Sequence, residues 1–96
     1  MRLATGKRAS AERMVTFECF APDAGCVAVA GDFNAWKPQA LLMHKDRNGI
    51  WRATLALPAG RYEYRFILDG VWTSDPHALV QVPNAFGGWN AVVAVS

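Results

Sequence analysis

The chain has 96 residues, of which 52% are hydrophobic and 19% are charged, and its formal net charge is +2. This composition is typical of a soluble globular domain. The length is sufficient for one hydrophobic core that needs no stabilising disulfide bond or metal ion. No apolar run approaches the length of a helical membrane span, so no membrane partner is expected. The body after residue 13 carries six basic and seven acidic residues, which excludes the basic surface that nucleic-acid binding requires.

The N-terminal residues differ in composition from the rest of the chain. Residues 1–13 carry four basic residues and one acidic residue. We expect a flexible basic tail over 1–13 and one folded domain over 14–96. The tail has no apolar segment of the kind found in secretory signals, so a cytoplasmic location is expected. An Arg-rich amphipathic transit peptide is the alternative.

Apolar and polar residues alternate along several short segments, which predicts β-strands. Strands are expected at 14–20, at 26–30, at 40–44 as an edge strand, at 50–57 with Trp51 facing the core, and at 90–95. Residues 77–88 are expected to be irregular. Short strands separated by turn signals, with no convincing helix, predict an all-β protein with an immunoglobulin-like antiparallel β-sandwich. A small barrel is the alternative.

Residues 62–76 predict a strand, a two-residue turn at Asp69-Gly70 and a second strand, which together form a hairpin. Leu68 would then pair with Val71, and Ile67 with Trp72. Alternation assigns one face to the core, with Tyr62, Tyr64, Phe66, Leu68 and Val71. The other face should meet water, yet it carries Arg61, Glu63, Arg65, Ile67 and Trp72. An exposed Trp beside an Ile and an Arg conflicts with simple patterning, and such conflicts are expected at functional sites.

No motif of a catalytic, cofactor-binding or metal site is present. Asp32, Asp69 and Asp75 could be paired as carboxylates for glycoside hydrolysis, but each stands in a turn-favouring context where Asp caps the backbone. Cys19 and Cys26 flank a turn and are expected as buried thiols, with a disulfide between them as the oxidised alternative. Together with the distant His44 and His77 they do not form a metal site. The chain is therefore not expected to be an enzyme or to carry a cofactor.

Aromatic residues in loops are the main functional signal. Trp36, Trp72 and Trp89, with Phe86, stand in irregular or non-core positions. An aromatic plane packs against the C–H face of a pyranose, and the sugar hydroxyls need donors and acceptors such as Arg65 and Asn90. Two aromatic planes at an angle would suit a curved α-1,4-glucan. Because Trp, Tyr and Arg also dominate protein interfaces, recognition of another protein is the competing interpretation.

The elements GDFNAW (31–36) and YEYRFILDGVWTSDP (62–76) resemble carbohydrate-binding module family 48. This family includes the glycogen-binding domain of the AMP-activated protein kinase β subunit and the N-terminal domains of isoamylases and branching enzymes. The resemblance covers residues 15–95 and implies an immunoglobulin-like early-set sandwich. It implies binding of α-1,4-glucan: glycogen, starch, maltooligosaccharides or β-cyclodextrin.

The resemblance also implies roles for single residues. Trp36 and Trp72 match the two glucan-stacking tryptophans, and Asn90 matches a sugar-contacting Asn. Arg65 stands where kinase-type members place a hydrogen-bonding Lys. Phe86 lies near a Leu that enters the glucan ring in that group. In the GGWN segment (87–90) the sequence departs from the pattern, because Gly88 replaces a Thr and Trp89 replaces an aliphatic residue; Trp89 would be a third stacking surface.

The sequence thus predicts a non-catalytic α-glucan-binding module. The alternative is a regulatory or protein-interaction domain with a vestigial sugar site. Its protein partner would be an enzyme of glycogen metabolism or a kinase subunit.

Overall fold

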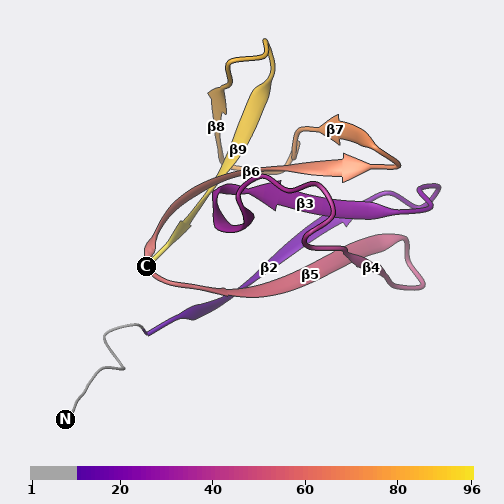
Figure 1. Ribbon diagram of the computed structural model, residues 1–96. Helices are drawn as coiled ribbons and strands as arrows, with labels where there is room; N and C mark the ends of the chain where they lie inside the picture. Colours follow the sequence, from indigo (N-terminus) through magenta and orange to yellow (C-terminus); the bar gives the residue numbers. More distant parts are fainter. Residues whose placement is uncertain (1–10) are drawn as a thin grey trace.

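A computed structural model describes residues 11–96, and in this part of the chain the regular structure is almost entirely β-strand (Figure 1). The strands are β2 (Arg13–Phe20), β3 (Val27–Gly31), β4 (His44–Lys45), β5 (Ile50–Leu57), β6 (Gly60–Leu68), β7 (Val71–Thr73), β8 (Val80–Pro83) and β9 (Trp89–Val95). One 3₁₀ turn, η2, covers Asp32–Asn34. Most of the predicted basic tail, residues 1–10, lies outside the described residues.

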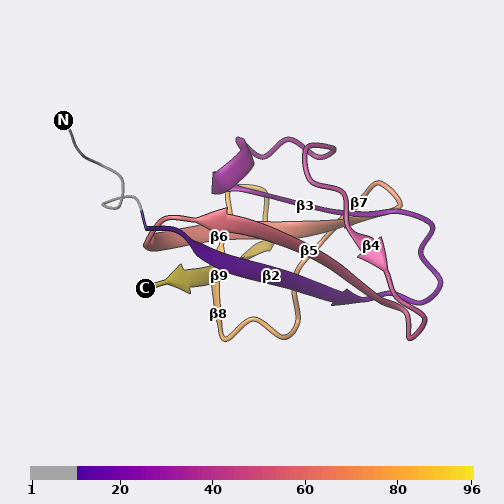
Figure 2. The same cartoon turned by 90° about the horizontal axis from the view of Figure 1, so that it is seen from below.

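The strands form two antiparallel sheets that pack face to face. The smaller sheet has the order β2-β5-β4, and the larger has the order β3-β6-β9-β8, with β7 paired to β6. β2 and β5 lie across β6 and β9 when the molecule is seen from below (Figure 2). The hairpin β8–β9 projects away from the smaller sheet (Figure 1). This architecture confirms the predicted immunoglobulin-like sandwich.

The core lies between the two sheets. Val27, Val29 and Phe66 of the larger sheet are fully buried there. Phe17 of β2 makes an edge-on contact with Tyr64, with ring centroids 4.9 Å apart. Trp51 is buried as predicted, and its Nε1–H donates a 2.8 Å hydrogen bond to the carbonyl of Ala21.

A tyrosine–carboxylate pair is buried at the margin of this core. The hydroxyl of Tyr64 donates a 2.6 Å hydrogen bond to Asp75 Oδ2, while Asp75 Oδ1 accepts the His77 N–H at 2.9 Å. Burial is the main cause that raises the pKa of Tyr64 far above its usual value. The hydrogen bond with Asp75 and the negative charge of Asp75 raise this pKa further. Asp75 therefore satisfies backbone and side-chain donors, in agreement with its structural interpretation.

The hairpin β6–β7 has the predicted register, because Leu68 pairs with Val71 and Ile67 with Trp72. Asp69 and Gly70 both have positive φ, 48° and 85°, as a two-residue type I′ turn requires. The Asp69 carboxylate also accepts the N–H groups of Gly25 and Cys26, at 3.0 and 2.9 Å. Asp69 thus holds the preceding β2–β3 turn against the hairpin.

Two face assignments in this hairpin were wrong. Val71 is 64% exposed rather than in the core, because it directly follows the turn, where the core ends at the half-buried Leu68. Ile67, expected to face water, is only 6% exposed. It packs in a second small cluster with Ala28 and Ala30, and Trp36 covers this cluster from outside.

Other expectations also need correction. Residues 77–88 were expected to be irregular, but they contain β8, which pairs with β9 over Val80–Pro83. The predicted edge strand at 40–44 is reduced to β4 and an isolated bridge between Leu42 and Ala28. Cys26 is exposed rather than buried, because it precedes the first buried residue of β3, while Cys19 is half-buried; both are free thiols.

Candidate functional site

A groove with a volume of about 620 Å³ lies on the face of β6 that points away from the core. It is bounded by the loop after β3, by β6 and β7, and by the hairpin β8–β9. Its lining residues are Asp32, Trp36, Glu63, Arg65, Trp72, Pro83, Asn84, Ala85, Phe86 and Asn90. The size suits a small-molecule or oligosaccharide ligand.

The loop after β3 is shaped by the start of the GDFNAW segment. A Cβ at Gly31 would lie 2.4 Å from the carbonyl oxygen of Glu63, so only glycine permits this close approach of β3 to β6. Asn34 closes the turn, because its Oδ1 accepts the Gly31 N–H at 3.0 Å and its Nδ2 donates to the Val29 carbonyl at 3.1 Å. Phe33 packs on Phe17 and anchors the loop in the core.

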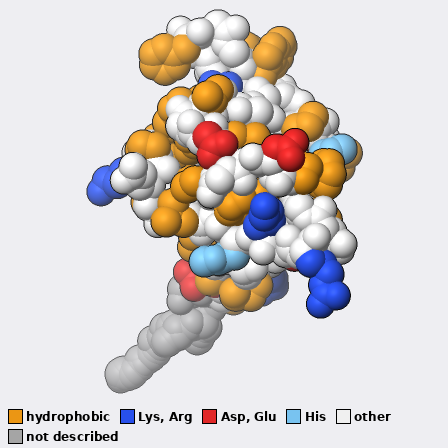
Figure 3. Space-filling model, turned by 90° about the vertical axis from the view of Figure 1, so that its right-hand side faces the viewer, with side chains coloured by type: hydrophobic (Ala, Val, Ile, Leu, Met, Phe, Trp, Pro, Cys, Tyr) orange, Lys and Arg blue, Asp and Glu red, His pale blue; other side chains and the backbone are white. Residues whose placement is uncertain are grey.

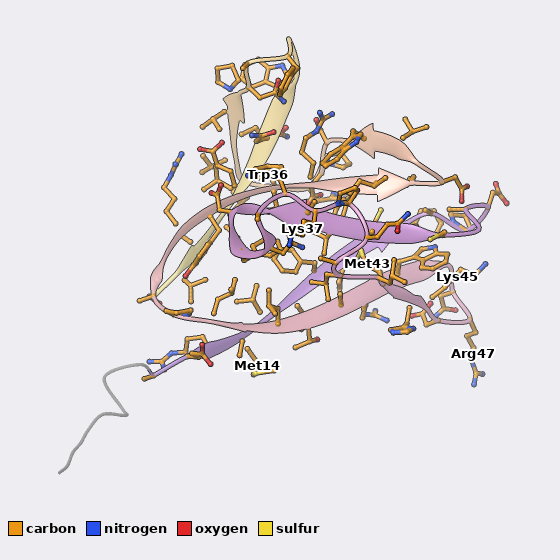
Figure 4. All side chains as sticks on the ribbon, viewed as in Figure 1. Met14, Trp36, Lys37, Met43, Lys45 and Arg47 are labelled. Carbon is orange, nitrogen blue, oxygen red and sulfur yellow. The ribbon has the colours of Figure 1, made fainter. Side chains whose placement is uncertain are left out.

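Trp36 is held over the outer face of the larger sheet by this loop. Ala35 and Trp36 both adopt left-handed backbone conformations, with φ of 57° and 60°. Consecutive non-glycine residues in this region are costly, and such strain is often found at functional sites. Figure 4 shows Trp36 on the side of β3 and β6 that faces away from β2 and β5.

Trp72 is brought beside Trp36 by strand pairing. Its partner on β6 is Ile67, whose side chain lies under Trp36. The two indole rings have centroids 6.4 Å apart and planes inclined at 34°. Trp72 keeps 38% of its surface exposed. The pair therefore forms one tilted aromatic wall of the groove.

Arg65 is the cation of the groove. Its Nη2 donates to the carbonyl of Trp72 at 3.3 Å, and its Nε is buried without a hydrogen-bond partner. Gly88 lies next to the guanidinium: a Cβ there would stand 3.7 Å from Nη1. Within residues 11–96, the ion pairs closer than 4.0 Å do not include Arg65. The guanidinium thus keeps hydrogen-bonding capacity for a ligand.

Three side chains that line the groove form a hydrogen-bonded chain. Asn84 Nδ2 donates to Asn90 Oδ1 at 3.1 Å, and Asn90 Nδ2 donates to Glu63 Oε1 at 3.1 Å. Asn84 Oδ1 accepts the N–H groups of Phe86 and Gly88, which fixes the turn between β8 and β9. Because Asn90 accepts from Asn84 and donates to Glu63, these two hydrogen bonds fix the orientation of its amide in the groove.

Comparison with known proteins identifies the family. Residues 15–96 match the family described as the glycogen recognition site of AMP-activated protein kinase. The chain belongs to this family. The match confirms the family resemblance and the prediction of a glucan-binding module.

Individual relatives of this glycogen-recognition domain have diverse functions. Protein FLOURY ENDOSPERM 6, chloroplastic, of Oryza sativa subsp. japonica is 35% identical over 75 residues, which are 78% of this chain and 14% of that protein. The 1,4-alpha-glucan branching enzyme GlgB of Salinibacter ruber is 32% identical over 89 residues, or 85% of this chain and 14% of the enzyme. The 5'-AMP-activated protein kinase subunit beta-1 of Sus scrofa is 36% identical over 69 residues, or 72% of this chain and 53% of the subunit.

The chain thus spans between about a seventh and about a half of the length of these relatives. Some relatives are enzymes, but the family match is to a binding domain. The rice relative is named as chloroplastic, so the comparisons do not support the expected cytoplasmic location. Within residues 11–96, no helix has the length and hydrophobicity of a membrane span.

The structure brings together five of the six side chains singled out from the sequence. The groove of the glycogen-recognition domain is lined by Trp36, Arg65, Trp72, Asn90 and Phe86. Phe86 stands at the tip of the β8–β9 hairpin and is 93% exposed. Hydrophobic side chains at this projecting tip are visible at the top of Figure 3.

Trp89 is the exception. It is 52% exposed but does not line the groove. Trp89 stands two residues before Ala91 on β9, and Ala91 points into the core. Alternation therefore directs Trp89 to the reverse side of the hairpin from Asn90. The Ser74 hydroxyl donates to the Trp89 carbonyl at 3.0 Å, which ties this side of the hairpin to the segment after β7.

Sequence reasoning missed three polar residues of the groove: Asp32, Glu63 and Asn84. Glu63 could have been found, because it shares the parity of Arg65 on β6. Asp32 was predicted to cap the backbone, and its Oδ2 does accept the Glu63 N–H at 2.7 Å. The prediction missed the role of its other oxygen, Oδ1, which accepts the Trp36 Nε1–H at 3.1 Å. Asn84 gave no signal, because it lay in the stretch expected to be irregular.

Proposed function

We propose that this domain is a non-catalytic binding module in which Trp36 and Trp72 stack on glucose rings of an α-1,4-glucan. The observation that carries the proposal is the pair of indoles, 6.4 Å apart and tilted by 34°, along one wall of an open groove. An α-1,4-glucan curves from one residue to the next, so its successive rings are tilted with respect to each other. A flat β-1,4-glucan would match two tilted planes less well.

The polar wall supplies hydrogen bonds to the sugar hydroxyls. The guanidinium of Arg65 donates, and the amide of Asn90 and the carboxylate of Glu63 line the same groove beside it. Such neutral and charged partners suit hydroxyl groups, which both donate and accept. Phe86, at the hairpin tip, adds an apolar surface at the end of the groove.

The expected affinity is modest, with a Kd between roughly 10 µM and 1 mM, because stacking and a few exposed hydrogen bonds must offset the loss of ligand freedom. The test is native electrophoresis with and without glycogen in the gel. Wild type should be retarded by glycogen, and Trp36→Ala should migrate as in the glycogen-free gel. Unretarded wild type would refute the proposal.

The second measurement is the specificity of the groove. Tryptophan fluorescence is titrated with maltohexaose and, as a control of the same length, with cellohexaose. Saturable quenching by the α-linked oligosaccharide alone supports the proposal. Equal responses to both sugars would contradict the role given to the tilt of the two indoles.

The alternative, a protein-interaction domain, is tested with the same purified domain and its variants. The exposed side chains at the β8–β9 hairpin, including Phe86 and Trp89, favour it. If a protein partner is captured and its capture is lost on Trp89→Ala but not competed by β-cyclodextrin, the hairpin rather than the groove carries the interaction.

A further inference from the structure

The carboxylate of Asp32 connects the groove's first tryptophan to the sheet beneath it. Its Oδ1 accepts the Trp36 Nε1–H at 3.1 Å, and its Oδ2 accepts the backbone N–H of Glu63 at 2.7 Å. Both oxygens therefore have a fixed donor, one on the loop and one on β6. Hydrogen bonds to an ionised acceptor are stronger than those between neutral groups.

Few other contacts fix the plane of the Trp36 ring. Below it lie Ala28, Ala30 and Ile67, and the two alanines offer only methyl groups to the indole. At its side, the Trp36 ring lies next to the ring of Trp72, which is itself partly exposed. A ring on such a flat apolar base can rotate and slide at small cost, so the directional bond to Asp32 decides its orientation.

We propose that Asp32 is a positioning residue: its carboxylate holds the Trp36 indole at the tilt to Trp72 that glucan stacking requires. This inference rests on the proposed function and adds to it a residue that acts through Trp36 rather than through the sugar. It also fixes how Trp36 contacts a ligand. Because the indole N–H is already bonded to Asp32, Trp36 offers the ligand its ring face, and the hydrogen bonds come from Arg65, Asn90 and Glu63.

The first experiment compares unliganded proteins by circular dichroism. Two indoles at this separation couple and give a paired negative and positive far-ultraviolet band. The couplet of Trp36 and Trp72 is defined as the signal that disappears in both Trp36→Phe and Trp72→Phe. Asp32→Ala should reduce this couplet strongly, and Asp23→Ala, which removes an exposed carboxylate at the β2–β3 turn, should leave it unchanged.

The second experiment is a double-mutant cycle on maltoheptaose affinity. Asp32→Ala should weaken binding about tenfold, the loss expected for a hydrogen bond to a charged group. In the Trp36→Phe background, which retains an aromatic face but has no N–H, the same change should cost less than about twofold. Asp32→Leu, which keeps the approximate size of the side chain but has no acceptor oxygen, replaces Asp32→Ala in both experiments if the alanine variant does not fold.

An unchanged couplet in Asp32→Ala would overturn the inference. So would an equal loss of affinity in both backgrounds, which would indicate a direct sugar contact or a general effect on the fold. If wild type binds no maltoheptaose, the proposed function fails, while the couplet still reports whether Asp32 positions Trp36.

Discussion

The two faces of strand β6 meet different surroundings. On one face, Tyr64 and Phe66 are buried against the opposite sheet, and the polar atom of Tyr64 is satisfied internally by Asp75. On the other face, Glu63 and Arg65 line an open groove, and Arg65 takes part in none of the ion pairs shorter than 4.0 Å within residues 11–96. One strand thus contributes a closed core and a surface with unused hydrogen-bonding capacity. Substitutions on the core face should therefore change the stability of this domain, whereas substitutions on the groove face should change ligand binding.

The largest effect is expected on the core face. Phe66→Ala should lower the free energy of unfolding by about 3–5 kcal/mol, because the ring is fully buried and its removal leaves a cavity. Urea unfolding followed by far-ultraviolet circular dichroism measures this. Trp72→Ala is the control on the groove face and should change stability by less than about 1 kcal/mol. If the two variants lost similar amounts of unfolding free energy, the claim that only the core face determines stability would be contradicted.

The second effect concerns binding on the groove face. Trp72→Ala should weaken maltoheptaose binding at least about thirtyfold, equivalent to about 2 kcal/mol, because an aromatic face is lost from the groove wall. Isothermal titration calorimetry compares it with Trp89→Ala, which removes a more exposed tryptophan outside the groove and should change the Kd less than about twofold. A larger loss in Trp89→Ala would place the site on the reverse side of the hairpin.

The third effect is a pH dependence on the core face. The folded pKa of Tyr64 is raised by burial and by Asp75, so the fold favours the protonated hydroxyl. The stability that this contributes is present below the unfolded pKa of about 10 and is lost as pH rises above it, by up to about 1.4 kcal/mol per pH unit. Tyr64→Phe cannot ionise, so its stability deficit relative to wild type should shrink above pH 10. Tyr62→Phe, which removes a hydroxyl that donates to the Pro58 carbonyl at 2.7 Å, is the control. A Tyr64→Phe deficit that stays constant above pH 10 would contradict the role given to Tyr64.

The smallest effect separates charge from geometry in the groove. Arg65→Lys keeps the positive charge but loses the planar fork of donors, so maltoheptaose affinity should fall about threefold to tenfold. Arg65→Gln, which keeps planar donors without the charge, is the matched variant. If Lys binds as tightly as Arg and Gln does not, charge rather than donor geometry sets the contribution.

Local patterning was sufficient to predict the hairpin and most of its faces. Alternation on β6 and the positive φ needed at Asp69-Gly70 fix the register, which brings Trp72 opposite Ile67. The sequence could not show that Ile67 is covered, because its cover, Trp36, comes from a loop whose path depends on close contact at Gly31 and on the Asn34 cap. Burial of a sheet face depends on segments distant in the chain, and periodicity carries no information about them.

The reverse placement of Trp89 has a related cause. Residues 77–88 lack regular alternation, so β8 was missed, and with it the register that sets the direction of each side chain in the hairpin. A one-residue difference in parity moves a side chain to the opposite face. Asn90 and Trp89 are neighbours in sequence, yet one lines the groove and the other does not. Motif resemblance alone did not distinguish them.

The most direct test of the groove as the glucan site is a titration of the isotope-labelled domain with maltoheptaose, followed by the four tryptophan indole N–H signals in nuclear magnetic resonance spectra. Each signal is assigned by a single Trp→Phe substitution. The signals of Trp36 and Trp72 should shift together and saturate with one Kd, while those of the buried Trp51 and the reverse-side Trp89 should move little. Shifts centred on Trp89, or four unmoved signals at millimolar sugar, would contradict the account.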